Sequence, residues 1–160
     1  MLPSQVLTKQ ASAVDAWARL LRGHAAAIRE LSAQLVVEHG LTINDYEALL
    51  SLSRAGGGRM RRVDLAGELM LTASGVTRLL EGLERAGFVE RAECASDRRV
   101  TYAVLTPAGR DKLEAASESH LAGVSALFEE RFSAEEIEQL TTLLSRLPEA
   151  AEASGSDCSP

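Results

Sequence analysis

The sequence predicts a mostly α-helical chain with one small β-hairpin, an α+β arrangement in which helices begin and end the fold. Apolar residues recur at helical spacing through most of the chain, and β-branched and aromatic residues cluster around 88–106. The first and last helical stretches carry apolar stripes that a lone helix cannot bury. At 160 residues with 46% hydrophobic composition, the chain is sized for one domain, or for one domain plus an oligomerisation element.

Charge is distributed unevenly along this acidic chain. The whole sequence has 17 Lys/Arg and 23 Asp/Glu, a formal net charge of -6. Segment 54–99 holds nine arginines against seven acidic residues, which leaves eight basic and 16 acidic residues elsewhere, so the two parts carry +2 and -8. A mildly basic block inside an acidic protein suits a local surface that binds a polyanion.

Neither a membrane segment nor a cysteine or metal site is predicted. No apolar run approaches the roughly 18 residues that span a bilayer, and MLPSQVLTKQ lacks the order of a signal peptide, so we expect a cytoplasmic protein with no membrane partner. Cys94 and Cys158 have no CxxC or Cys/His spacing, which favours two free thiols. His24, His39 and His120 share no spacing typical of metal ligands or of a catalytic triad.

The first helix is predicted from Val14 to Gly40, and a second helix follows it. Apolar positions of the first helix repeat at alternating intervals of three and four residues, a heptad seam that needs a partner helix from the same chain or from a second copy. The seam residues are Val14, Trp17, Leu21, His24, Ile28, Leu31 and Leu35. The second helix has Thr42 as its N-cap and Asp45 three residues later, and 56–58, three glycines, end it.

Two further helices joined by a tight turn are predicted between Arg61 and Gly87. Their apolar positions at helical spacing are Val63, Ala66, Leu69 and Met70 in the shorter helix, and Val76, Leu79, Leu80 and Leu83 in the longer. The longer helix starts with Ala73, Ser74 and Gly75, small residues that let a helix start approach a phosphate backbone closely. This pattern is typical of a helix-turn-helix.

The segments FVERAEC and VTYAVLT predict the two strands of a β-hairpin with the charged tip ASDRR. Thr106-Pro107 then begins a long helix that extends to about Phe132. A capping box of Ser133 and Glu136 begins a last helix, which Pro148 stops. The remaining residues, EAAEASGSDCSP, are small and polar, and we expect them to form a disordered tail.

The order of these elements, with the motifs GVTRLLEGLERAGFVER and DRRVTYAVLTPAG, resembles the multiple-antibiotic-resistance-regulator (MarR) family of bacterial transcription factors. The spacing from Asp97-x-Arg99 through Leu105-Thr106 to Gly109 matches that family's wing-to-helix signature. The resemblance implies a winged helix-turn-helix flanked by N- and C-terminal dimerisation helices, in a homodimer that binds a palindromic operator on double-stranded DNA. The implied division is an N-terminal dimerisation helix (1–38), a DNA-binding domain (39–106), C-terminal dimerisation helices (107–148) and a tail (149–160).

DNA contacts are expected on the recognition helix, in the major groove, and on the wing, in the adjacent minor groove. Arg78 is the best candidate for a base or phosphate contact, Arg99 for insertion into the minor groove and Arg98 for a phosphate. We expect Asp97 to orient Arg99 or to tie down the turn by hydrogen bonds. The alternatives are a solvated turn and an ordinary capped surface helix. The predicted set is Arg62, Thr72, Ala73, Ser74, Gly75, Thr77, Arg78, Asp97, Arg98 and Arg99.

The resemblance also implies a small organic effector, aromatic or anionic, that binds between the dimerisation helices and the winged helix and releases DNA from a repressor. The candidate ligand residues are Trp17, His24 and Asp64, with Arg62 as a possible neighbour. Dimer packing and a satisfied histidine are the alternative for Trp17 and His24. A relative that senses oxidants would carry its reactive cysteine near the first helix, where this chain has none; Cys94 is expected to be structural.

An enzyme is the competing class of protein. A catalytic domain attached to a winged helix would need its own βαβ repeats, a GxG-type loop and about a hundred further residues, and the sequence has none of these. We therefore expect no catalytic activity and no cofactor or metal. A winged helix used to bind protein rather than DNA remains as the second alternative.

Overall fold

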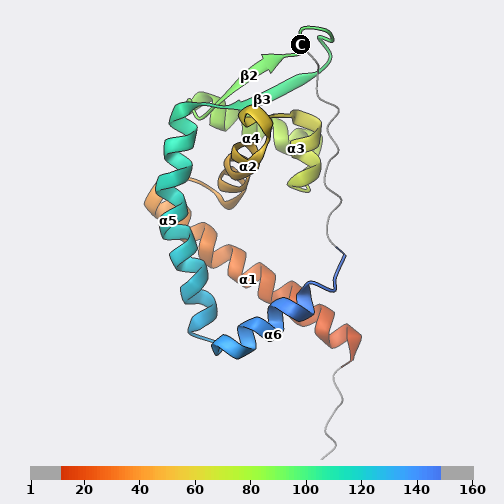
Figure 1. Cartoon of the computed structure of the whole chain (residues 1–160), viewed down its shortest axis with the longest axis vertical. Helices are drawn as coiled ribbons and strands as arrows, with labels where there is room; N and C mark the ends of the chain where they lie inside the picture. Colours follow the sequence, from red (N-terminus) through yellow and green to blue (C-terminus); the bar gives the residue numbers. More distant parts are fainter. Residues whose placement is uncertain (1–11, 149–160) are drawn as a thin grey trace, which may run out of the picture.

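The computed structural model describes residues 12–148, which form six α-helices and one three-stranded antiparallel sheet (Figure 1). The elements are α1 (Ala13–His39), α2 (Ile43–Arg54), the 3-10 turn η1 (Gly56–Gly58), β1 (Arg59–Arg61), α3 (Arg62–Glu68), α4 (Ala73–Arg85), β2 (Val89–Glu93), β3 (Thr101–Leu105), α5 (Pro107–Glu129) and α6 (Ala134–Leu144). The predicted fold class, mostly α with a small β wing, is confirmed.

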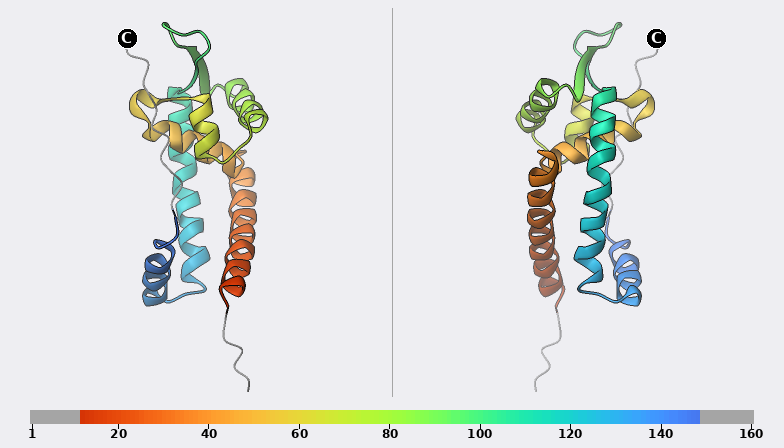
Figure 2. Two further views of the ribbon diagram at one scale, coloured as in Figure 1. Left: turned by 90° about the vertical axis from the view of Figure 1, so that its right-hand side faces the viewer. Right: turned by 90° about the vertical axis from the view of Figure 1, so that its left-hand side faces the viewer.

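The helices and the sheet divide into two regions. Helices α1 and α5 pack against each other as long rods, and α6 folds back at the far end of α5 (Figures 1 and 2). We call α1, α5 and α6 the stalk. Helices α2, α3 and α4 and the sheet gather at the other end of the stalk, and we call them the winged-helix unit.

Helix starts follow the capping residues of the sequence. The side chain at the N-cap accepts a hydrogen bond from the backbone of the third helical residue in five helices, at Ser12, Thr42, Thr72, Thr106 and Ser133. These bonds satisfy backbone donors that a helix start otherwise leaves unpaired. Helix α3 is the exception among the described α-helices, because its N-cap, Arg61, makes no such bond.

The sheet contains one strand more than the sequence predicted. Strands β2 and β3 form the predicted hairpin, and β1 pairs antiparallel with the other side of β3, from Arg59 opposite Val104 to Arg61 opposite Tyr102. The segment Arg-Met-Arg is too short and too polar to predict a strand by itself. It is ordered by its pairing with β3, which a local pattern does not report.

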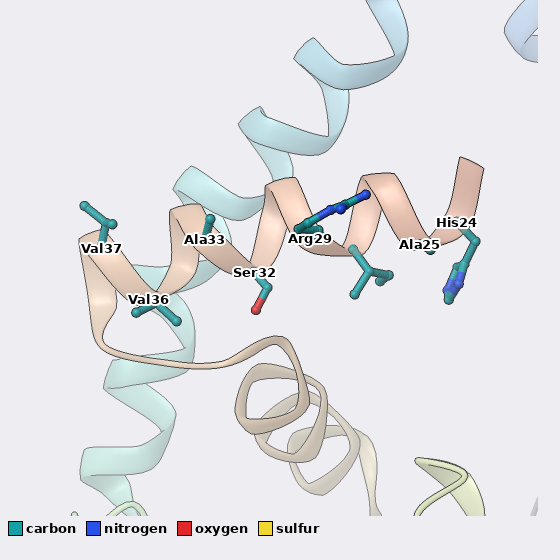
Figure 3. A pocket seen from close by; sticks show the side chains of 8 residues that line it. His24, Ala25, Arg29, Ser32, Ala33, Val36 and Val37 are labelled. Carbon is teal, nitrogen blue, oxygen red and sulfur yellow. The ribbon is translucent and has the colours of Figure 1, made fainter. Parts of the chain in front are cut away.

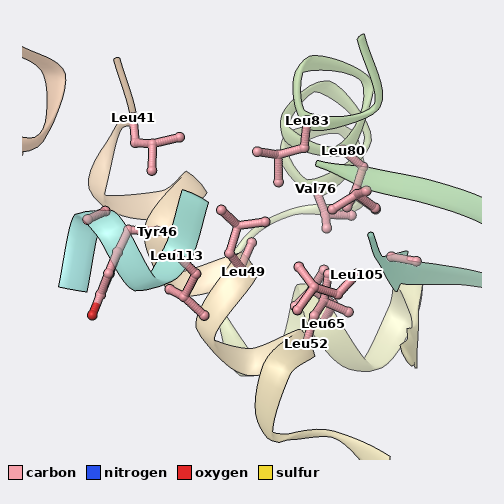
Figure 4. Close-up of a cluster of buried hydrophobic side chains, with 14 of the residues drawn as sticks. Leu41, Tyr46, Leu49, Leu52, Leu65, Val76, Leu80, Leu83, Leu105 and Leu113 are labelled. Atoms are coloured by element: carbon pink, nitrogen blue, oxygen red, sulfur yellow. The ribbon is translucent and has the colours of Figure 1, made fainter. Parts of the chain in front are cut away.

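The main core lies inside the winged-helix unit (Figure 4). Leu49 and Leu52 of α2, Leu65 of α3 and Leu80 of α4 are each 0% exposed. Leu35 of α1 and Leu113 of α5 join the same cluster, so the stalk is anchored in this core. Three of the four apolar positions predicted for α4 are buried, and the fourth, Leu79, packs against the cluster.

The predicted apolar face of α3 is wrong at two positions. Val63 and Met70 are 71% and 85% exposed, whereas Leu65, which the predicted stripe omitted, is fully buried beside Ala66. A helix of seven residues makes only two turns, so its sequence is too short for the spacing to select one face. Met70 lies beyond the end of α3, where the chain turns toward α4 with a positive φ of 52°.

The outer half of the stalk keeps its apolar stripe exposed in the single chain. Leu31 and Leu35 of the seam are buried, but Val14, Trp17 and Leu21 are 74%, 60% and 49% exposed. None of the residues of α6 is buried. The seam therefore has two parts: one packs within the described chain, and one has no partner within it.

Cys94 at the end of β2 is buried and disulfide-bonded, so the expectation that it is a free thiol is wrong. The sequence around Cys94 holds no local motif such as CxxC, so it did not predict this bond. Cys158 and the predicted disordered tail, 149–160, lie outside the described residues.

Candidate nucleic-acid interface

The recognition helix predicted from the sequence is α4, and its first turn is built from small residues. The Thr72 hydroxyl accepts a hydrogen bond from the backbone N–H of Gly75 at 3.1 Å and lies 3.2 Å from the Ser74 hydroxyl. A Cβ added at Gly75 would lie 3.2 Å from the same hydroxyl, tighter than an ordinary contact. The cap therefore favours glycine there, and Ala73 and Ser74 beside it are exposed.

The outward face of α4 is set by the face that it buries. Val76, Leu80 and Leu83 point into the core, so Arg78 lies on the exposed side. The Thr77 hydroxyl donates to the carbonyl oxygen of Ala73 at 2.8 Å, and its side chain is half-buried. Arg78 is thus the one basic residue in the first two turns of α4, and its side chain is exposed.

The tip of the wing is held by Asp97. Its carboxylate oxygen Oδ1 accepts a hydrogen bond from the backbone N–H of Arg99 at 2.9 Å, and its backbone carbonyl accepts from Val100 at 3.0 Å. Asp97, Arg98 and Arg99 are all exposed. Within residues 12–148, Asp97 forms no ion pair with either arginine, so its contact with the turn is made through the backbone.

A groove of about 660 Å³ runs between α3, the start of α4 and the end of the wing tip, where β3 begins. Among its lining residues are Arg62 of α3, Ala73 and Thr77 of α4, and Arg99 of the wing. These are four of the ten residues predicted to contact DNA, and they come from three separate elements. Arg78 and Arg98 lie outside the groove, on the exposed surface.

Sequence reasoning missed Arg61, which also lines this groove. The Asp64 carboxylate binds its guanidinium with both oxygens, with Nε–Oδ2 and Nη2–Oδ1 distances of 2.5 and 2.9 Å. These hydrogen bonds, together with the negative charge of Asp64, raise the pKa of Arg61 above its ordinary value. The spacing of an arginine and an aspartate three residues apart at a helix start is the sequence signal that could have identified the pair.

The three predicted ligand residues are not brought together. His24 lines a shallow groove of about 810 Å³ on α1, between Ala25 and Val37 (Figure 3), but neither Trp17 nor Asp64 does. Trp17 lies further out on the stalk, and both oxygens of Asp64 are taken by Arg61.

Polar side chains connect the stalk to the winged-helix unit. The ring of His120 on α5 lies 4.5 Å from that of Tyr46 on α2, between centroids, and its Nδ1 is buried without a hydrogen-bond partner. Burial lowers the pKa of His120 and raises that of Glu47 on α2, where the charge of His24 partly offsets the effect. Within the stalk, His39 at the end of α1 hydrogen-bonds the Ser119 hydroxyl of α5 at 2.7 Å.

The wing-to-helix signature has a steric explanation. A Cβ added at Gly109, in the first turn of α5, would lie 2.0 Å from the carbonyl oxygen of Phe88. That carbonyl accepts from the backbone N–H of Thr106 at 3.1 Å, and the Thr106 hydroxyl donates to the carbonyl of Gly87 at 2.7 Å. Only a residue without a side chain lets α5 start this close to the foot of the wing.

Comparison with known proteins identifies the family. The model of the MarR family matches residues 41–101. The chain is 33% identical over 117 residues to the helix-turn-helix-type transcriptional repressor YetL of Bacillus subtilis, and the alignment covers 70% of each chain. The chain belongs to the MarR family. It is a transcriptional regulator and not an enzyme, as its curated relatives are transcriptional regulators.

Solved structures of MarR regulators share the fold. The chain resembles AbsC of Streptomyces coelicolor with 34% identity and a TM-score of 0.69, over 87% of this chain and 95% of that one. It resembles Sco3205 of the same organism, solved in complex with DNA, with 25% identity and a TM-score of 0.77, over 92% and 94% of the two chains. Between Ser12 and Pro148, no helix of this MarR regulator is long and apolar enough to cross a membrane.

Proposed function

We propose that this MarR-family regulator is a homodimeric repressor that binds a palindromic operator in the cytoplasm and releases it when a small organic effector binds. The observation that carries DNA binding is the groove that gathers Arg62, Thr77 and Arg99 from α3, α4 and the wing. Neither Arg62 nor Arg99 has an ion-pair partner in the described chain, so both charges are available to phosphates. The name of the relative YetL supports repression.

Dimerisation is proposed from the exposed part of the stalk. Trp17 and Leu21 of α1, Leu143 of α6 and Leu147 just beyond α6 are between 49% and 60% exposed, and large apolar side chains at this density mark an interaction surface. Segments 1–38 and 107–148 would then pair with the same segments of a second copy. Sedimentation at micromolar concentration tests this, and a monomer would contradict the proposed architecture.

Two-fold symmetry determines the expected operator. Each subunit places α4 in a major groove and the wing in the next minor groove, so the half-sites lie about one helical turn apart. Footprinting of the DNA upstream of the regulator's own gene is the decisive experiment. Protection that shows a dyad is expected; protection without a dyad would contradict the dimer model, and the absence of any protection would favour a winged helix that binds protein instead.

The residues of the wing have separable roles in this proposal. Arg99 enters the minor groove, Arg98 meets a phosphate and Asp97 holds the turn. Arg98→Ala should weaken binding equally on all sequences and, with two copies per dimer, reduce the salt slope by about 1.8. Arg99→Ala should cost more on AT-rich flanks, where the narrow groove concentrates negative potential. Arg146→Ala, beyond the end of α6 and away from the winged-helix unit, is the control with the same change of charge.

The effector is proposed to bind near the stalk, where His24 and Trp17 lie on α1. Trp17 is the only tryptophan of the chain, so its fluorescence reports directly on this region. A panel of aromatic carboxylates can be screened for release of operator DNA and for a change in that fluorescence. A compound that releases DNA without changing the fluorescence of Trp17 would show that Trp17 is not part of the effector pocket.

A further inference from the structure

Helix α3 starts differently from the other α-helices that the structure describes. Five of them begin at a serine or threonine that caps the helix, and three of those carry an acidic residue at the third position that bonds back to the cap. In α3 the N-cap is Arg61, and the acidic residue at the third position, Asp64, binds the arginine guanidinium instead. A serine at position 61 would complete an ordinary capping box, so helix stability does not explain the arginine.

The Arg61–Asp64 pair lies at the joint between the wing and the helix-turn-helix. Strand β1 ends at Arg61 and α3 begins at Arg62, so no loop residue separates them. The backbone of Arg61 is paired with Tyr102 of β3, the central strand of the wing sheet. The two side chains are only 25% and 15% exposed, and a bidentate pair in such a setting holds a fixed geometry better than a surface pair does.

Arg61 also forms part of the groove wall, and its pairing with Asp64 offsets the positive charge that it brings there. Asp64 neutralises Arg61, which leaves Arg62 and Arg99 as the cations of the groove. Arg99 belongs to the wing, and Thr77 on the neighbouring wall belongs to α4. A change of angle at the joint between β1 and α3 would therefore change the distance between the two parts that are proposed to touch DNA.

We propose that Arg61 and Asp64 are positioning residues for operator binding. Their bidentate ion pair fixes the wing relative to α3 and α4, so that one duplex meets the recognition helix and the wing together. The inference rests on the proposed function, in which both elements contact DNA. It assigns neither Arg61 nor Asp64 a contact with DNA of its own.

The first test is Asp64→Asn in the full-length chain, with hydroxyl-radical footprinting and titration on the operator fragment. We expect about ten-fold weaker binding and loss of the outer protections made by the wing, while the central protections made by α4 remain. Electrostatics alone predicts the opposite, because the substitution removes a negative charge next to a basic groove. Unchanged or tighter binding with an intact footprint would overturn the inference.

Arg61→Ser separates positioning from helix stability. This substitution supplies a hydroxyl that caps α3 and pairs with Asp64, so thermal stability should be equal to or above that of the wild type. The outer protections should still be lost, as in Asp64→Asn. An Arg61→Ser chain that melts like the wild type and keeps the full footprint would show that the pair has no positioning role.

A double substitution, Arg61→Asp with Asp64→Arg, tests rescue by restoring an ion pair in reverse. Recovery of the outer protections supports the inference, whereas a stable double variant without recovery contradicts it. Arg85→Ser, in the last turn of α4, is the control for loss of one arginine from the same unit. A wild-type chain that leaves no footprint would refute the proposed function itself, and unchanged variants of a binding wild type would refute only the positioning role.

Discussion

The winged-helix unit and the outer half of the stalk use their leucines in opposite ways. In the unit, Leu49, Leu52, Leu65 and Leu80 are completely buried and come from three different helices. In the outer stalk, Leu21 and Leu143 are about half exposed, as is Leu147 just beyond α6, and α6 buries none of its residues. The unit therefore has a core of its own, while the outer stalk has an apolar surface and no core.

This difference separates folding from assembly in the same chain. Burial of a leucine side chain contributes about 1.5–3 kcal/mol, so the unit gains its stability within one copy. The outer stalk gains little until a second surface covers it. Substitutions in the unit should accordingly change the free energy of unfolding, and substitutions in the outer stalk should change self-association.

The largest contrast is expected between Leu49→Ala and Leu143→Ala. The first creates a cavity in the core of the unit and should lower its free energy of unfolding by about 3–4 kcal/mol. The second removes a half-exposed side chain and should leave the unfolding of the unit unchanged, while it weakens self-association. Urea unfolding and sedimentation measure the two effects. Equal loss of unfolding free energy in both variants would contradict the assignment of Leu49 to a core and of Leu143 to an exposed surface.

The next largest effect is expected at the joint between wing and stalk. Gly109→Ala places a methyl group against the Phe88 carbonyl, and since both groups are backbone-anchored, α5 must shift at a cost of about 2–3 kcal/mol. Gly82→Ala is the matched control, because nothing lies within 4 Å of an added Cβ in the middle of α4. It should stabilise the unit by about 0.5–1 kcal/mol. Thermal unfolding distinguishes the two, and a Gly109→Ala variant of wild-type stability would refute the steric account of the signature.

A smaller effect, a gain in the stability of the unit, is expected from the turn between α3 and α4. Met70 adopts a φ of 52°, where a residue with a Cβ is disfavoured, and its side chain is almost wholly exposed. Met70→Gly should therefore stabilise the unit by about 0.5 kcal/mol. This is the difference between the backbone strain that glycine relieves and the conformational entropy that it adds to the unfolded chain. Met70→Ala keeps the strained backbone and should give no gain. A stabilised alanine variant would mean that the methionine side chain, and not its φ, is unfavourable.

The smallest effect is expected from titration of His120, which connects the two regions. Its pKa is lowered from 6.5 in the folded chain, so between that lowered pKa and 6.5 the unfolded chain binds more protons. The contribution of neutral His120 to stability is fully present above pH 6.5 and is lost as the pH drops through this window. His120→Phe keeps a ring against Tyr46 and should remove this slope, a change in Tm of about 2 °C or less. If stability depends on pH with the same slope in the wild type and in His120→Phe, groups other than His120 cause that dependence.

Elements specified by neighbouring residues could be predicted from the sequence, and those specified by distant contacts could not. The starts of α2, α5 and α6 were predicted correctly because Thr42, Thr106 and Ser133 act within one helical turn. Strand β1 depends on its pairing with β3, far away in the sequence, and no local motif marks the disulfide of Cys94, so neither leaves a local signal.

The candidate site shows the same limit. Helical spacing placed Arg62 and Thr77 on two helices of one motif, and turn chemistry placed Arg99 on the wing. That these side chains line a single groove follows only from the packing of the wing against α3 and α4. Arg61 was not predicted as a site residue because it lies in β1, a strand that the sequence pattern does not predict.

The uninterrupted α1 helix has a consequence for how such a chain can change in length. Over 27 residues it carries both Leu35, anchored in the core of the unit, and the exposed seam around Trp17. Since each residue of an α-helix advances the chain by about 1.5 Å and turns it by about 100°, one inserted residue would rotate the seam a quarter of the way around the axis. Seven inserted residues return it to within about 20° of its original direction. The smallest insertion that lengthens the stalk and keeps the seam within about 20° of its direction is therefore seven residues, two helical turns or about 10 Å.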